Sequence, residues 1–385
     1  MRLPEGMFMK NLKLIVAAAA LALAPPAWTQ HHAPAEPALG LEDALALVKS
    51  DQPRIEAYEH EAQASEQAAV AARSLPDIQI TAGFQNFPIN GRNALSPTAD
   101  EMTMYTIGVM REQVRRSKRE AESNRILADA LVSRRQASAE ERHIRRDVML
   151  AWIDAVEAIE RQDLLGRMIA DLRTGRKVIE GAIPTGGSTP ALALQADAEI
   201  AIEQAQLADA KRAETLARSQ LERWIGMAAY RPLPDTIPNI EVAPGMMSSM
   251  DQHPDIQVAL AQQQAAEREV EVASQGRKWD PTWSVMLGIR PTYGEMVTAT
   301  VSIPLQINRR NRQDRLVAEA RARADAAALR AEDTRRELAD QYRSAFVDYD
   351  GANAELKHID GEAIPALESA FKIAEARYAG GGSGT

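Results

Sequence analysis

The chain of 385 residues contains no cysteine. Disulfide bonds, thiolate metal sites and a lipid anchor on an N-terminal cysteine are therefore excluded. Aromatic residues are scarce, at 4%, whereas Ala, Glu, Arg and Gln are abundant. This composition is typical of long helices and coiled coils rather than of a compact globular domain. The formal net charge of -9 argues against nucleic acid as a partner.

Long apolar runs are also absent after Ala24, so a later membrane crossing would have to use β-strands. The one earlier run, Leu14 to Ala24, follows Lys10 and Lys13 and is closed by Pro25. It is too short for a membrane-spanning helix and predicts a secretory signal peptide over residues 1–30, followed by a linker over 31–40. The mature chain would then lie beyond the inner membrane.

The mature sequence contains an internal repeat. Two Ala-rich helices begin near Pro53 and Pro254, and each leads into a pair of strands. We predict the strands near residues 78–87 and 102–110 in the first copy, and near 282–290 and 296–305 in the second. The separation between matching features stays at roughly 190 to 205 residues. This predicts a first repeat over 41–236, a linker over 237–250 and a second repeat over 251–385.

The predicted strands alternate between apolar and polar residues, which gives each strand one apolar and one polar face. Because a closed barrel needs about eight strands, four strands must pair with those of other copies or pack on their own helices as a small soluble sheet. Polar loops at 90–101 and 290–295 favour pairing with other copies. The expected lipid-facing residues are Ile78, Ile80, Val285, Leu287, Ala299, Val301 and Ile303.

Very long helices follow the strands. Neither glycine nor proline occurs from Arg111 to Leu165 or from Asn308 to Asp350, and a helix of about 50 residues is about 75 Å long. A narrow apolar stripe predicts packing against neighbouring helices. In the first copy this stripe comprises Ile144, Val148, Trp152, Ala155 and Ile159.

The order of signal peptide, helix, strand pair and helical hairpin, repeated once, resembles the TolC-type outer-membrane efflux protein family over nearly the whole mature chain. The local similarities are the helix starts at Pro53 and Pro254, the turn at Ile303-Pro304-Leu305, and the helix tips at 185–188 and 378–383. Three segments are most similar to the heavy-metal branch, the cobalt-zinc-cadmium and copper-silver efflux channels. They are Phe87-Pro88, Met102-Thr103-Met104 and Ile107-Gly108-Val109-Met110.

The resemblance implies a mainly α fold with a small β part. Long antiparallel coiled-coil helices would form a periplasmic α-barrel, and four strands per protomer would join a shared trimeric outer-membrane β-barrel. It implies a homotrimer in the outer membrane with a large periplasmic portion. The implied partners are a periplasmic adaptor, an inner-membrane proton-driven pump and outer-membrane lipid.

The function implied is passive conduction of heavy-metal cations, with no catalytic residues and no cofactor, so we expect a channel rather than an enzyme. A type I protein-secretion or drug-efflux channel would share this fold. A periplasmic coiled-coil adaptor protein would also be exported and helical, but it should carry a single helical hairpin inserted in β domains.

Three groups of residues are candidates for functional sites. Glycine-rich tips permit tight reversals between helices, and in the resembled family they face the adaptor. These tip residues are Gly186, Gly187, Ser188, Gly381, Gly382 and Ser383.

A second group is basic and directly follows the return strands. It comprises Arg115, Arg116, Lys118 and Arg119 in the first copy and Arg309, Arg310 and Arg312 in the second. We call this group the basic collar. We hypothesise that it contacts lipid phosphates at the inner leaflet; the alternative is a solvated helix start paired with nearby Glu residues.

The third group consists of weaker metal candidates: Met246, Met247, Met250 and His253. Thioethers suit Cu(I), although methionines near a loop more often serve packing.

A further expectation concerns the C-terminus. The second copy stops at Thr385 where its return helix should begin, so we expect the natural chain to continue for a few dozen residues.

Overall fold

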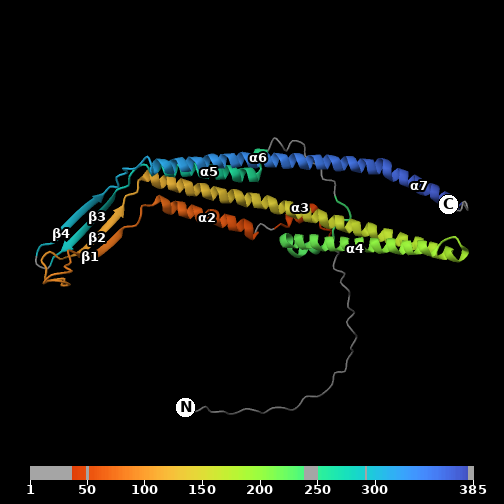
Figure 1. Ribbon diagram of the computed structural model, residues 1–385, viewed down its shortest axis with the longest axis horizontal. Coiled ribbons are helices and arrows are strands. Elements are labelled where there is room, and N and C mark those ends of the chain that lie inside the picture. Colours follow the sequence, from red (N-terminus) through yellow and green to blue (C-terminus); the bar gives the residue numbers. More distant parts are fainter. Residues whose placement is uncertain (1–36, 49–51, 238–249, 291–292, 380–385) are drawn as a thin grey trace, which may run out of the picture.

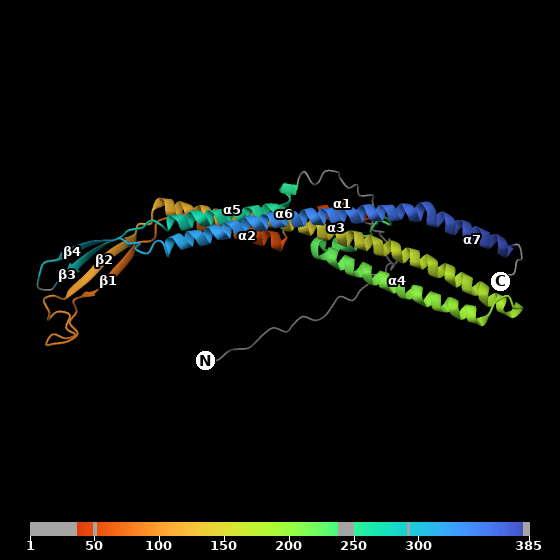
Figure 2. The same cartoon turned by 45° about the horizontal axis from the view of Figure 1, so that its top comes forward.

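The computed structural model describes residues 37–48, 52–237, 250–290 and 293–379. The predicted signal peptide, Met246 and Met247, and the tip at 381–383 lie outside these residues. The described chain is elongated, with a small sheet at one end and long helices running from it toward the other (Figures 1 and 2). Among the described helices, none has both the length and the apolar composition that a membrane crossing requires.

The two copies share one order of elements. The first copy consists of α1 (Leu41–Ala46), α2 (Pro53–Arg73), β1 (Gln79–Gln85), β2 (Met104–Glu112), α3 (Arg116–Ala182), the short 3-10 helix η1 (Ile183–Thr185), α4 (Pro190–Ile225) and η2 (Gly226–Tyr230). The second consists of α5 (Pro254–Gln275), β3 (Thr282–Ile289), β4 (Met296–Ser302), α6 (Gln313–His358), the π-helical turn η4 (Ile359–Ala363) and α7 (Ile364–Ala379).

Local chemistry explains several boundaries. Helices α2, α4 and α5 each begin at a proline, whose fixed φ suits the first helical turn and whose missing N–H is not needed there. Strand β4 ends at Ser302, earlier than we predicted. Its ladder stops before Pro304 because that residue has no N–H to donate.

The four strands form one antiparallel sheet in the order β1-β2-β3-β4. Strands β1 and β2 pair within the first copy, and β3 and β4 pair within the second. The two copies meet at β2 and β3, where Val109 lies opposite Val285. Within one chain, β1 and β4 are therefore the two edges of the sheet.

Helix α3 has 67 residues and is about 100 Å long. It packs against α2, α4 and α5, whereas α6 packs against α5. The predicted apolar stripe of α3 is confirmed as core, because Ile144, Val148 and Trp152 are at most 1% exposed. They pack with Leu221 and Trp224 of α4.

The end of the predicted linker 31–40 is also part of this core. Leu39 is fully buried, its N–H donates to the Pro232 carbonyl at 2.7 Å, and its carbonyl accepts a hydrogen bond from Trp152 Nε1 at 2.9 Å. No periodic pattern predicts this role, because a single extended residue has no periodicity.

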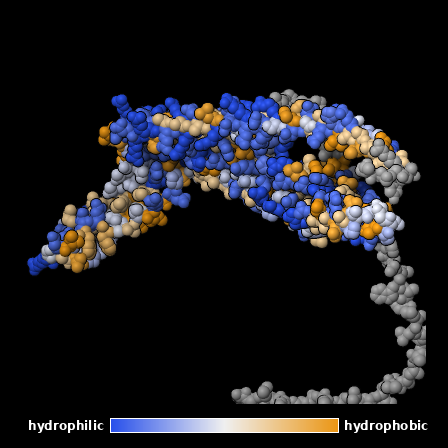
Figure 3. Space-filling view, turned by 45° about the vertical axis from the view of Figure 1, so that its right-hand side comes forward, coloured by the Kyte–Doolittle hydropathy of each residue, from blue (hydrophilic) through white to orange (hydrophobic). Residues whose placement is uncertain are grey.

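The far part of the second copy is covered less well. Phe346 on α6 and Leu367 and Phe371 on α7 are 52%, 70% and 70% exposed. Figure 3 shows hydrophobic residues at the sheet and toward the opposite end of the molecule, with a mostly hydrophilic region between them.

Candidate functional site

The sheet has one apolar face. The strand registers place Ile80, Val109, Val285 and Ala299 in one row across all four strands. The next row on the same face contains Ala82, Ile107, Leu287 and Val297. Much of this apolar face is exposed; Ile80 and Val297 are 75% and 72% exposed. Such a continuous exposed apolar surface is typical of a lipid or protein contact.

The opposite face is polar and rich in methionine. One row contains Gln79, Ser284 and Thr300, and the next contains Thr81 and Thr298. The row after that contains Thr106 and two glycines. The methionines in these rows are Met104, Met110, Met286 and Met296. The predicted period-2 alternation thus becomes a sheet with two chemically different faces.

Asp280 forms an ion-pair centre where the sheet meets the helices. Its carboxylate accepts from the Arg115 backbone N–H and from Arg115 Nε, both at 2.9 Å, and from Lys118 Nζ at 3.0 Å. Burial opposes ionisation of Asp280, but these hydrogen bonds and the two positive charges outweigh it and lower the pKa of the carboxyl. The centre joins the start of α3 in the first copy to the turn before β3 in the second.

Arg115 also caps helix α5. Its guanidinium donates to the carbonyls of Gln275, Lys278 and Trp279 at 2.7, 3.2 and 3.1 Å. The last carbonyls of a helix lack partners within that helix, so an arginine placed there stabilises the helix end. Arg119 does the same for α2 by donating to the Arg73 carbonyl.

The basic collar therefore divides into two kinds of residue. Arg115 and Arg119 bind backbone carbonyls at the ends of α5 and α2, whereas the side chain of Arg116 is 83% exposed and pairs with Glu120 of the next helical turn. In the second copy, Arg309 is 54% exposed and lies 3.6 Å from Asp314, and Arg310 and Arg312 are exposed. Contact of the collar with lipid phosphate remains a prediction.

The first helix tip is a tight reversal between α3 and α4. Gly186 has a positive φ of 75°, and the Gly187 N–H donates to the Ala182 carbonyl at 2.9 Å. Thr189 caps α4 by accepting from the Leu192 N–H at 3.4 Å. The glycine at position 186 thus has the conformational role that we predicted; its contact with an adaptor is still a prediction.

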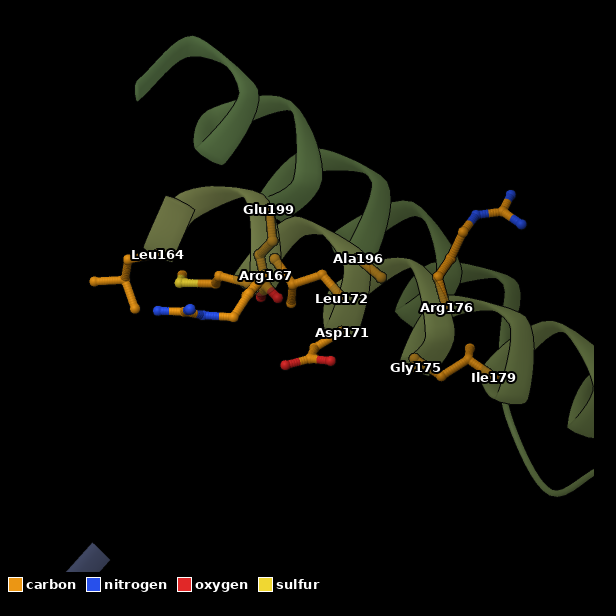
Figure 4. A pocket seen from close by; sticks show the side chains of 10 residues that line it. Leu164, Arg167, Asp171, Leu172, Gly175, Arg176, Ile179, Ala196 and Glu199 are labelled. Carbon is orange, nitrogen blue, oxygen red and sulfur yellow. The ribbon is translucent and has the colours of Figure 1, made fainter. Parts of the chain in front are cut away.

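A surface groove of about 540 Å³ runs along the same hairpin. Leu164, Leu172 and Ile179 of α3 line it with Ala196 and Glu199 of α4 (Figure 4). The groove is shallow, open and mostly apolar, which suits packing of another helix better than enclosure of a small ligand.

Two of the metal candidates are described, Met250 and His253, and they line a shallow pocket with Arg142 and Tyr342. The His253 ring lies near Asp255, which also lies 3.2 Å from His143 Nε2. Burial lowers the pKa of His253, and the Arg142 charge adds to this effect. Within the described residues, no group of three or more His, Cys, Asp or Glu side chains is arranged to hold a metal ion.

Sequence reasoning missed the role of Asp280. The first helix is followed by Pro76-Asp77 and the second by Asp280-Pro281, so the order of the two residues is reversed between the copies. That reversal was visible, but nothing in the sequence linked it to Arg115 or Lys118.

At the level of sequence, neither a protein-family model nor a curated protein matches this chain. Solved structures do match its fold. The outer membrane protein VceC from Vibrio cholerae is 18% identical with a TM-score of 0.69, over 89% of this chain and 86% of that one. The channel-forming protein CusC is 14% identical with a TM-score of 0.73, over 90% and 83%. The CmeC outer membrane channel of Campylobacter jejuni is 14% identical with a TM-score of 0.69, over 89% and 77%.

The chain therefore has the fold of outer-membrane channel proteins, and the predicted mainly α fold with a small β part is confirmed.

Proposed function

We propose that the chain is one protomer of a TolC-type outer-membrane channel that passively conducts solutes outward from the periplasm. The observation that carries this proposal is the two-faced sheet. Its apolar rows suit contact with lipid, and its polar face suits a water-filled lumen. The long helices would continue the duct into the periplasm.

The partners follow from the same architecture. Three copies would combine their strands into one barrel, and the tip at Gly186 and Gly187 would face a periplasmic adaptor coupled to an inner-membrane proton-driven pump. The repeat of helix, strand pair and long helix opposes the alternative of an adaptor, for which we expect a single hairpin. Neither catalysis nor a cofactor is part of this role.

Heavy-metal cations are the proposed substrates. Besides the motif resemblance, support comes from the methionines on the polar face, because thioethers bind soft ions such as Cu(I). Met110 and Met286 both lie on this face, in adjacent rows. Conduction of drugs or proteins does not require thioethers on the polar face of the sheet.

The test is a strain lacking this protein, challenged with copper, silver, zinc, cobalt and cadmium beside a panel of detergents. We expect increased sensitivity to one or more metals. Sensitivity to detergents or drugs alone would contradict the metal assignment and leave the channel assignment intact.

A second experiment tests the thioethers themselves. The Met110→Leu/Met286→Leu variant keeps the side-chain size but removes both sulfur atoms from the polar face, and we expect it to complement copper or silver tolerance poorly. The matched control is Met168→Leu/Met227→Leu, which changes two methionines outside the sheet. Equal complementation by the two variants would contradict a role for the sheet methionines.

A further inference from the structure

The outer edges of the sheet have no strand partner within the described chain. Strands β1 and β4 are exposed along their whole lengths, and apolar side chains such as Ile80 and Val301 are 75% and 66% exposed. A long apolar edge with unpaired N–H and carbonyl groups readily pairs with another strand. The internal repeat indicates which strand this is and in which register it pairs.

The junction between β2 and β3 serves as the template. In the repeat, Ile80 corresponds to Val285 because Gly83 matches Gly288 and Pro76 matches Pro281. The two ladders then make Val109 correspond to Ala299. Since Val109 lies opposite Val285, a repeated junction would place Ala299 of one copy opposite Ile80 of the next.

The same operation applies to the arginine contact below the sheet. In the chain, Arg115 follows β2 and occupies the end of α5. The offset from Val109 to Ala299 maps position 115 onto Leu305, because the connection from β4 to α6 is longer than that from β2 to α3. The basic residues of this longer connection follow a few positions later and would lie near the end of α2 in a second copy. These residues are Arg309, Arg310 and Arg312, the second-copy part of the basic collar, and all three are exposed.

The end of α2 has a groove that fits this segment. It has a volume of about 710 Å³ and is lined by the last turn of α2, the Pro76 turn and the acidic residues Asp77, Glu112 and Glu122. Lys118 and Arg119 also line it, but Lys118 pairs with Asp280 and Arg119 binds a carbonyl of α2. Glu122 pairs with Arg125 of its own helix, so Asp77 and Glu112 are the carboxylates that the groove offers to an incoming basic segment.

We propose that this groove receives the segment Arg309–Arg312 of a second copy of the chain, while β4 of that copy pairs with β1 so that Ala299 lies opposite Ile80. The inference rests on the proposed sharing of the sheet among copies. It adds the register of the pairing and assigns the exposed arginines to a protein contact instead of lipid.

Disulfide crosslinking tests the register directly, because the natural chain has no cysteine. In the Ile80→Cys/Ala299→Cys variant, we expect oxidation to link copies into covalent multimers on a non-reducing gel. A bond within one chain is excluded, because β1 and β4 are three strand spacings, about 14 Å, apart, beyond the reach of a disulfide.

The matched control is Phe84→Cys/Ala299→Cys, which uses the same strands and the same face but shifts one cysteine by about 13 Å along β1. We expect it to remain monomeric on the gel. Equal or better crosslinking of this control would overturn the register.

Charge reversal tests the groove. In the crosslinking variant, adding Arg309→Glu/Arg310→Glu should lower the multimer yield about fivefold or more, because two attractions become repulsions. Adding Asp77→Arg to that protein should restore most of the yield. The control Arg167→Glu/Arg173→Glu changes the net charge equally on the distant part of α3 and should leave the yield unchanged.

The oxidation is carried out in detergent without phospholipid, to separate protein docking from lipid binding. If the charge-reversed variant gives the normal multimer yield in detergent but binds less to phosphatidylglycerol vesicles, the arginines contact lipid and the docking proposal is overturned. Conductance in planar bilayers is measured separately. Conductance without the expected crosslinks overturns the register alone, whereas crosslinked multimers that do not conduct overturn the proposed channel function.

Discussion

The two repeats have the same order of elements but very different surroundings. In the first, α3 is covered by α2, α4 and α5, and its stripe forms the core around Trp152. In the second, α6 packs on α5, and aromatic residues such as Phe346 remain exposed. Similar sequences thus reach different burial because the neighbours differ. Likewise, Arg115 is bound within its chain while Arg310 is exposed, which makes the second repeat the part of the molecule most open to partners.

The largest expected effect comes from the core of the first repeat. Trp152→Ala should lower the free energy of unfolding by about 3 to 5 kcal/mol, because it leaves a cavity and removes the hydrogen bond to the Leu39 carbonyl. Urea denaturation followed by circular dichroism measures it. The control is Phe346→Ala in the second repeat, for which we expect less than about 1 kcal/mol. Equal losses would show that the two stripes are buried alike.

The next effect concerns two sets of ion pairs, one at Asp280 and one at Asp314. Asp280→Asn should cost about 2 kcal/mol at pH 7, because a nearly buried carboxylate loses its charge while Arg115 and Lys118 lose their counter-ion. Asp314→Asn, which affects the exposed Arg309 pair, should cost less than about 1 kcal/mol.

The pH dependence of stability tests whether the charge of Asp280 is the source of this difference. Folding lowers the pKa of Asp280, so its charge stabilises the fold above the unfolded-state value of about 3.9, and this contribution is lost as the pH falls through the lower folded-state pKa. The stability difference between the natural chain and Asp280→Asn should therefore shrink below about pH 4. A difference that stays constant from pH 7 to pH 3 would mean that the charge is not its source.

An effect of similar size is expected where the two repeats meet in the sheet. A Cβ on Gly108 would lie 2.9 Å from the Val285 carbonyl oxygen, whereas at Gly83 the nearest atom is 4.0 Å away. Gly108→Val should therefore cost about 1 to 3 kcal/mol, and Gly83→Val should be close to neutral. Urea denaturation compares them; a neutral Gly108→Val would show that the β2–β3 junction adapts easily.

The smallest effect is expected at the tip of the first hairpin. Gly186→Ala should cost about 1 kcal/mol because the native φ is positive. Gly166→Ala, within helix α3 and with open space around the new methyl group, should stabilise the chain by up to about 1 kcal/mol. Thermal unfolding curves should thus shift in opposite directions, and shifts in one direction would contradict the left-handed tip.

Much of the architecture could be predicted because it depends on regular periodicity. The period-2 pattern of Val297, Ala299 and Val301 predicted β4, and the spacing of Ile144, Val148 and Trp152 predicted the buried face of α3. Both predictions are confirmed. Contacts without periodicity cannot be predicted in this way. The linker predicted over 31–40 contains Leu39, which is buried in the core, and the basic collar contains Arg115 and Arg119, which bind carbonyls of their own chain.

The sequence by itself determined the repeat, the long helices and the two-faced strands, because each depends on the order of residues over one helical turn or one strand pleat. Only the tertiary structure decided that β2 pairs with β3, that Asp280 joins the two copies, and that the arginines of the second copy remain exposed. The first two features bring together residues more than 150 positions apart, and all three depend on the three-dimensional arrangement of the two repeats.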